Sequence, residues 1–79
     1  MMRILFFGPV ADRVKMRETQ VEFNAGMTLH DVIARLGVQH PGAFSIVSFI
    51  AVNQVQIHDR QMVLNDNDEI AFMAKFSGG

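Results

Sequence analysis

Hydrophobic and polar positions follow two different periods along this chain. Residues 3–8 form a short, almost continuously apolar run that stops at Gly8-Pro9, which is typical of a strand and its end. Because no polar position interrupts the run, we predict that this strand lies in the middle of a sheet. Residues 18–24 alternate instead, with one apolar and one polar face, which predicts a half-buried edge strand.

A helical period begins at Thr28. Thr28 occupies the N-cap position and Asp31 follows three residues later, which is the arrangement of a capping box. Gly37 stands where a helix C-cap is expected. The apolar positions between them recur at helical spacing and are Leu29, Val32, Ile33 and Leu36. We therefore predict one main helix that ends at Gly37 and covers a sheet with one apolar face.

The second half of the chain predicts further strands. Residues 40–42 read as a loop and residues 43–47 as a short helical turn, followed by strands over residues 49–53 and 56–58. A polar turn over residues 65–68 precedes the last strand, residues 69–76. In that strand Ile70, Phe72, Ala74 and Phe76 share one face, while Ala71, Met73 and Lys75 share the other.

The order of these elements favours an α+β fold of β-grasp type, which is the ubiquitin-like arrangement. Its mixed sheet has one main helix across one face, and the last strand lies beside the first. At 79 residues the chain makes one domain. We assign residues 1–76 to this domain and residues 77–79 to a C-terminal tail.

A single helix covers only one face of a sheet, so the opposite face needs an explanation. If Ile4 and Phe6 point into the core, then Leu5 and Phe7 point away from it, together with Met73 of the last strand. Apolar side chains on an uncovered face suggest a docking surface for a partner. Alternatively, Phe7 and Met73 lie beneath residues 43–47, and the sequence leaves both interpretations open.

Composition and charge exclude several classes of function. Seven basic and eight acidic residues give a net charge of -1, which provides no overall attraction for nucleic acid or an anionic membrane. The three cations Arg13, Lys15 and Arg17 are interpreted as a solvated edge. No cysteine is present, so disulfides and thiolate sites are excluded. No apolar run has the length of a membrane span, and we expect a soluble cytoplasmic protein.

Conventional catalytic and metal-binding patterns are also missing. The three histidines are scattered, and neither Ser45 nor Ser48 lies in a nucleophile motif. The acidic residues around Asp66 lack the glycine and distal glutamate of a calcium loop. We therefore predict no metal site and no permanently bound cofactor.

The C-terminal Ser77-Gly78-Gly79 carries the most credible chemistry. Glycines lack a Cβ atom, so such a tail can enter a channel that is too narrow for any side chain. Its reactive group would be the α-carboxylate of Gly79. Activation as a mixed anhydride with AMP, followed by attack of a sulfur nucleophile, would give a terminal thiocarboxylate.

Several segments in order carry a family resemblance. They are Ile4-Leu5-Phe6-Phe7, Ala51-Val52-Asn53-Gln54, and Leu64 followed by Asp68-Glu69-Ile70-Ala71-Phe72 and Ser77-Gly78-Gly79. With these segments the chain resembles the MoaD/ThiS group of ubiquitin-like sulfur carriers, and within it the small subunits of molybdopterin synthase. It departs from them at Ala74-Lys75, where those proteins usually have Pro-Pro.

The resemblance implies a set of partners and roles. An adenylating enzyme related to ubiquitin activators would use ATP to adenylate Gly79, and a sulfurtransferase would convert it to the thiocarboxylate. Phe76, Ser77 and Gly78 would then insert into the large subunit of molybdopterin synthase, in a heterotetramer, to deliver sulfur to a cyclic pyranopterin precursor. Phe7 and Met73 correspond to positions that face this partner. The large subunit would supply the catalytic groups, so the chain is not expected to act as an enzyme alone.

Four alternatives remain at this point. The chain could supply sulfur for thiamine thiazole synthesis. It could serve tRNA thiolation, or be a protein modifier joined through Gly79 to a lysine. In a different class of function, it could be a non-catalytic β-grasp interaction module whose glycine end has no chemical role.

Overall fold

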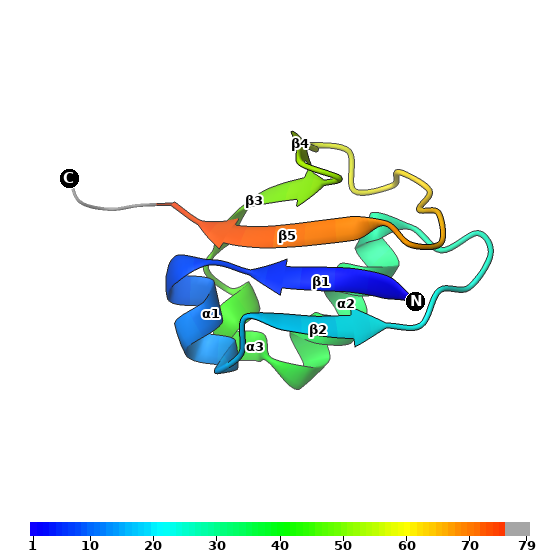
Figure 1. Ribbon diagram of the computed structural model, residues 1–79. Coiled ribbons are helices and arrows are strands. Elements are labelled where there is room, and N and C mark those ends of the chain that lie inside the picture. The colour runs from blue at the N-terminus through cyan, green and yellow to red at the C-terminus, as the bar shows by residue number, and fades with distance from the viewer. Residues whose placement is uncertain (76–79) are drawn as a thin grey trace.

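Figure 1 shows the computed structural model, which describes residues 1–75 as one mixed sheet with helices on one of its faces. The elements in chain order are β1 (Met2–Phe6), α1 (Gly8–Val14), β2 (Glu18–Val21), α2 (Leu29–Gln39), α3 (Pro41–Phe44), β3 (Val47–Val52), β4 (Val55–Gln56) and β5 (Glu69–Ala74). Phe76 and the tail residues 77–79 lie outside the described part of the chain.

The described strands form one sheet in the order β2-β1-β5-β3-β4. β1 pairs with β2 antiparallel and with β5 parallel, with Ile4 opposite Ile70 and Phe6 opposite Phe72. β3 pairs antiparallel with β5 and with the short β4. The predicted α+β fold of β-grasp type is confirmed, with the first strand central, the last strand beside it and β2 at the edge.

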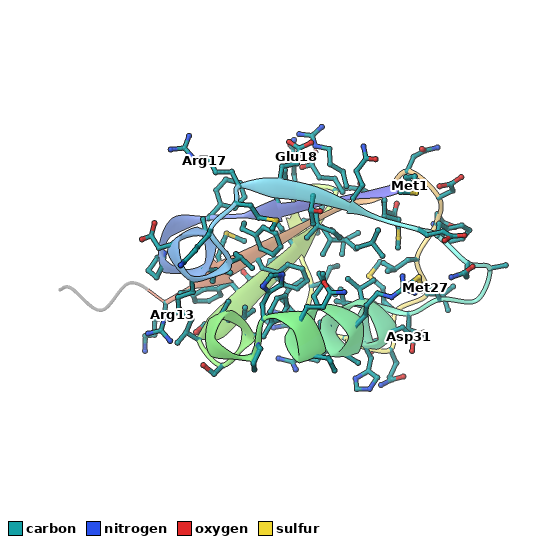
Figure 2. The ribbon with its side chains drawn as sticks, turned by 90° about the horizontal axis from the view of Figure 1, so that it is seen from below. Met1, Arg13, Arg17, Glu18, Met27 and Asp31 are labelled. Carbon is teal, nitrogen blue, oxygen red and sulfur yellow. The ribbon has the colours of Figure 1, made fainter. Side chains whose placement is uncertain are left out.

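The core lies between this sheet and the helices, as Figure 2 shows from below. Ile4, Ile70 and Phe72 are completely buried at the centre of the sheet. The Phe72 ring lies 6.2 Å from that of Phe6 and meets Phe44 of the α3 helix edge-on at 4.9 Å. Such aromatic pairs stabilise a small core beyond the area that they bury, so the two halves of the chain are joined through Phe72.

The helix α1 was not predicted from the sequence. We interpreted Gly8-Pro9 only as the end of a strand, but Pro9 also begins this helix, where its missing N–H costs no hydrogen bond. Val10 and Val14, four residues apart, then both point into the core with at most 4% exposure. A pattern of two apolar positions in seven residues is too short to distinguish this helix from a loop.

The predicted capping box of α2 is confirmed, but the predicted end of the helix is wrong. Thr28 Oγ1 accepts a hydrogen bond from the Asp31 N–H at 3.2 Å, and Asp31 Oδ2 accepts one from the Thr28 N–H at 2.9 Å. The helix continues through Gly37 to Gln39. Pro41 ends it instead, because a proline disfavours the helical conformation of the residue before it, here His40.

A buried carboxylate holds the end of the sheet that lies away from the tail. Asp68 is only 7% exposed; its Oδ1 accepts a hydrogen bond from Asn53 Nδ2 at 2.9 Å and its Oδ2 one from the Asn65 N–H at 2.8 Å. Asn53 Oδ1 in turn accepts a hydrogen bond from the Glu69 N–H at 3.0 Å. Asn53 and Gln54 turn the chain between β3 and β4 with positive φ angles of 51° and 70°. This network therefore ties that turn to the start of β5.

We predict that the capping box makes stability depend on pH in the acid range. The Thr28 backbone N–H, and secondarily its side chain, hold the pKa of Asp31 below its ordinary value of 3.8. A lowered pKa means that the ionised carboxylate stabilises the folded chain above 3.8, and that this contribution is lost as the pH falls through the folded-state pKa. Urea unfolding of wild type and Asp31→Asn should differ at neutral pH and converge below that range. An equal difference at both pH values would contradict the prediction.

Candidate functional site

The face of the sheet opposite the helices carries a continuous group of apolar side chains. We call this group the outer face; its members are Leu5, Phe7, Phe49, Ala51, Ala71 and Met73. Strand register brings them together, because Ala71 pairs with Leu5 on one side and with Ala51 on the other, and Met73 pairs with Phe49. The N–H of Phe7 donates to the Phe72 carbonyl at 3.1 Å, so Phe7 extends the same pattern one position beyond β1.

The two phenylalanines of the outer face are open to solvent. Phe7 is 48% and Phe49 is 40% exposed, whereas Leu5 and Met73 are half-buried. The alternative interpretation, in which residues 43–47 cover Phe7 and Met73, is wrong. Ala43 is buried and Phe44 contacts Phe72, which points to the core side of the sheet. The segment therefore packs on the helical face, and an apolar surface of this kind favours a partner.

Phe49 and Ala51 are the members of this surface that sequence reasoning missed. We predicted a strand over residues 49–53 but did not assign its faces. Ile50 and Val52 are buried, and alternation along a strand then directs Phe49 and Ala51 to the opposite side. The signal was present in the sequence, but the pairing with Met73 that makes Phe49 part of the same surface depends on strand order.

Charged side chains border the outer face around Arg3. Arg3 is the outward residue that precedes Leu5 in β1, and it lies between two carboxylates. Its Nε is 3.4 Å from Glu18 Oε2 and its Nη2 is 3.5 Å from Glu69 Oε2. Exposed ion pairs of this kind contribute little to stability. Their position shows that the apolar part of the face is confined to the end where the tail leaves the sheet.

β5 runs past Phe7 as it approaches the last described residue. Because β1 and β5 are parallel, their carboxyl ends lie at the same end of the sheet, and β5 runs from Phe72 through Ala74 toward that end (Figure 1). Ala74 is buried and pairs with Val47. β5 therefore stays paired up to Ala74, and Lys75 is the last described residue. The predicted site residues Phe76, Ser77, Gly78 and Gly79 lie outside the described residues.

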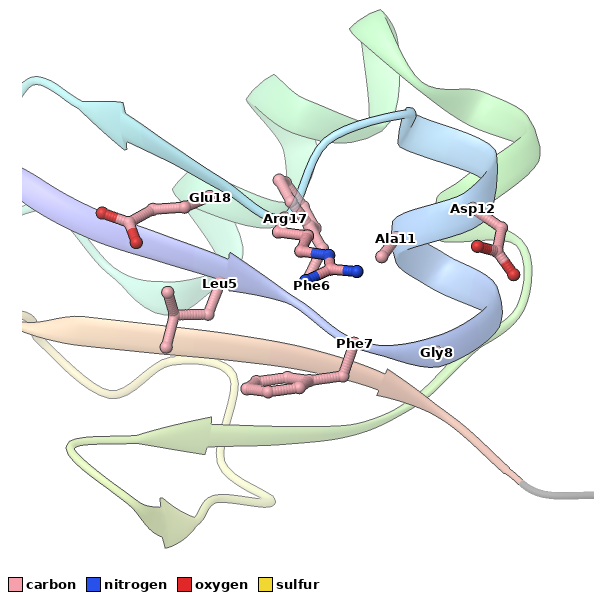
Figure 3. A pocket seen from close by; sticks show the side chains of 8 residues that line it. All are labelled: Leu5, Phe6, Phe7, Gly8, Ala11, Asp12, Arg17 and Glu18. Atoms are coloured by element: carbon pink, nitrogen blue, oxygen red, sulfur yellow. The ribbon is translucent and has the colours of Figure 1, made fainter.

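A hollow continues the outer face past the end of β1. Figure 3 shows that it lies between β1, the start of β2 and α1, with the Phe7 ring on one side and the Arg17 side chain and Ala11 on another. Its floor is mainly apolar, and the side chains of Asp12 and Glu18 also line it. The hollow can therefore hold an apolar group next to the Arg17 guanidinium.

The described residues show no other site with assembled chemistry. Within residues 1–75 no group of three or more His, Asp or Glu side chains is placed to hold a metal ion. In the same range no helix is long and apolar enough to cross a membrane. The outer face and the end of β5 remain the features that call for a functional explanation.

Comparison with known proteins identifies the family. The model of the ThiS family matches residues 4–79, which is nearly the whole chain. The chain belongs to the ThiS family. This confirms the resemblance to ubiquitin-like sulfur carriers of the MoaD/ThiS group. No curated protein matches this sequence significantly.

Solved structures show the same fold. SAMP1 from Haloferax volcanii superimposes with a TM-score of 0.84 at 20% identity, covering 99% of this chain and 98% of its own. Urm1 from Trypanosoma brucei gives 0.73 at 18% identity, covering 99% and 94%. A protein-protein complex of subunits 1 and 2 of molybdopterin-converting factor from Helicobacter pylori contains a chain with a TM-score of 0.63 at 24% identity, covering 99% and 97%. At these identities the likeness establishes the fold of this ThiS family member.

We predict that the outer face contributes little to the stability of the free protein. Phe7→Ala and Phe49→Ala remove side chains that are 48% and 40% exposed, so the free energy of unfolding should fall by only about 1 kcal/mol. Phe72→Ala is the control, because it empties a fully buried site and should cost about 3–5 kcal/mol. Denaturant unfolding measures all three, and a loss at Phe7 as large as that at Phe72 would show that its ring is part of the core.

Proposed function

We propose that this ThiS family member carries sulfur on the carboxyl terminus of Gly79. The single observation that supports this best is the parallel pairing of β1 with β5. It directs the carboxyl end of β5 toward an exposed apolar surface, so that a protein docked on the outer face is also next to the last described residues of the chain. A carrier needs this combination of a docking surface and an arm that reaches a second active site.

The proposed chemistry uses the chain as a substrate. A carboxylate oxygen of Gly79 attacks the α-phosphate of ATP, and pyrophosphate leaves to give an acyl adenylate. Sulfide released by a sulfurtransferase then attacks the carbonyl carbon, AMP leaves with the bonding electron pair, and the remaining S–H proton passes to solvent. The product is the thiocarboxylate of Gly79. The adenylating enzyme supplies the groups for these steps, and we expect the reaction in the cytoplasm, where ATP is available.

We further propose that the sulfur acceptor is a complex with the large subunit of molybdopterin synthase, in which this chain is the small subunit. The fold shared with a chain of the Helicobacter pylori complex of molybdopterin-converting factor subunits supports this choice. The outer face supports it as well, because Leu5, Phe7 and Met73 give a stable partner an apolar contact surface. The precursor that receives sulfur would be a cyclic pyranopterin.

A second candidate is a protein modifier joined through Gly79 to a lysine. It is favoured by the likeness to SAMP1, whose Haloferax volcanii structure is also described as small archaeal modifier protein 1. Both functions pass through the same acyl adenylate and differ in the nucleophile that follows. Delivery of sulfur for thiazole synthesis or tRNA thiolation would use the same thiocarboxylate, so only the acceptor enzyme separates these roles.

The terminal chemistry is tested by mass spectrometry. Protein incubated with ATP, the adenylating enzyme and a sulfur source should gain the mass difference between sulfur and oxygen, located on Gly79. Deletion of Gly79 should abolish this gain. It should leave thermal unfolding unchanged, because the core is formed by residues that precede the tail.

Two results of that experiment would contradict the proposal. No mass gain in the wild-type protein would exclude a sulfur carrier, and adducts with lysine side chains of other proteins would favour the modifier instead. An equal mass gain in the deletion variant would place the modified group elsewhere on the chain.

The docking role of the outer face is tested with the large subunit. Phe7→Ala and Met73→Ala should each weaken binding by about 1–2 kcal/mol, or roughly tenfold, as expected for apolar residues at the centre of an interface. Val38→Ala is the matched control, because Val38 is 84% exposed on α2, in the helical layer. Calorimetry measures the three affinities. Equal affinity of all three variants would place the partner on another surface.

A further inference from the structure

Basic side chains gather at the end of the molecule where β5 leads into the tail. Arg13 lies in α1, Lys15 is its C-cap, Arg17 follows before β2, and Lys75 follows β5. All four are exposed. Figures 1 and 2 show α1, Arg13 and Arg17 at the tail end of the sheet. We call these four residues the cationic rim.

Carboxylates do not neutralise the cationic rim within the described chain. The ion pairs of residues 1–75 join the N-terminus to Asp66 and Arg3 to two glutamates, and none involves the rim. Arg13 Nη1 donates to the Gly42 carbonyl at 3.0 Å, which is an uncharged partner. Asp12 and Glu18 are the two acidic residues at this end, and Glu18 is already paired with Arg3.

The near-neutral net charge therefore conceals a separation of charge along the molecule. Of seven basic and eight acidic residues, four cations and two carboxylates lie at the tail end. The remaining charges are six carboxylates and three cations, namely Glu22, Asp31, Asp59, Asp66, Asp68 and Glu69 with Arg3, Arg35 and Arg60. Several cations around one point produce a positive potential there, which attracts an acidic surface and speeds its approach.

The cationic rim and the outer face are suited to different kinds of complex. An apolar surface favours a lasting interface, whereas exposed charges change the rate and specificity of encounter more than the final affinity. A carrier must return to its activating enzyme after every delivery. The complex between carrier and activating enzyme therefore has to be short-lived and to form often. The terminal diglycine alone offers this enzyme no side chain with which to distinguish one carrier from another.

On the basis of the proposed function, we propose that the cationic rim is the recognition surface for the ATP-dependent adenylating enzyme. The rim lies on α1, the segment before β2 and the residue after β5, so the complementary surface of this enzyme is a set of carboxylates beside the channel that receives the tail. Arg17 stands at the border of the hollow in Figure 3. It therefore orients the enzyme relative to the outer face while Lys15 and Arg13 act mainly through their charge.

The test compares two double variants with the same change in net charge. Lys15→Glu/Arg17→Glu reverses two cations of the rim, and Arg35→Glu/Arg60→Glu reverses two cations outside the rim, one in α2 and one in the segment that follows β4. The probe is the purified adenylating enzyme of the same organism, followed by ATP-pyrophosphate exchange over a series of NaCl concentrations. Thermal unfolding of each variant shows whether it is folded.

We expect the rim variant to lose about tenfold in kcat/KM, mainly through KM, and to lose most of its dependence on salt. The kcat/KM of the control variant should stay within about twofold of the wild-type value. The affinity of the rim variant for the large subunit should fall by a smaller factor than its kcat/KM for exchange. The single variant Arg17→Glu repeats the test if the double variant is unstable.

Each of the remaining outcomes contradicts one particular claim. Equal losses in the two double variants would assign the effect to net charge, and unchanged exchange in both would remove the recognition role of the rim. A larger loss in large-subunit binding than in exchange would make the rim part of the acceptor interface instead. Wild-type protein that supports no exchange would overturn the proposed function itself.

Discussion

The parallel pairing of β1 with β5 is the constraint on which the rest of the structure depends. It joins the two ends of the described chain, with Ile4 opposite Ile70 and Phe6 opposite Phe72, and it makes both strands central. Parallel strands run in the same direction, so the carboxyl ends of β1 and β5 lie at the same end of the sheet. That geometry places Phe7, the hollow beside α1, the cationic rim and the exit of the chain at one end of the molecule.

The size of the chain explains why one face of the sheet stays open. With 79 residues the chain forms one helical layer, and this layer is fully used to cover Ile4, Ile70 and Phe72. A domain of this size buries only about 60% of the surface that its unfolded chain exposes. The uncovered side could have been polar. Instead it is apolar near the tail and charged around Arg3, which divides the face into a contact area and a solvated border.

Local patterns in the sequence predicted the elements that have strong signals of their own. The capping box at Thr28, the alternation of the last strand and the position of the first strand were correct, because each depends on residues close together in the chain. The predicted end of α2 was wrong because the sequence contains two residues that can end a helix. The helix continues through Gly37 and ends before Pro41. The pairing of Phe49 with Met73 and the position of Arg13 and Arg17 at the end of the sheet where β5 ends (Figure 2) could not be predicted, because they result from strand order, which no short segment specifies.

The central place of β5 also has a consequence for how the protein is made. β5 is the last described strand, and the sheet has β1 on one side of it and β3 on the other. A chain that stops before Glu69 lacks the strand that holds these two halves together, and its apolar strands remain unpaired. A ribosome must therefore synthesise β5 before the domain can fold, and the tail follows β5 within a few residues. A chain that lacks β5 therefore cannot complete this sheet. A folded domain indicates that synthesis has passed β5.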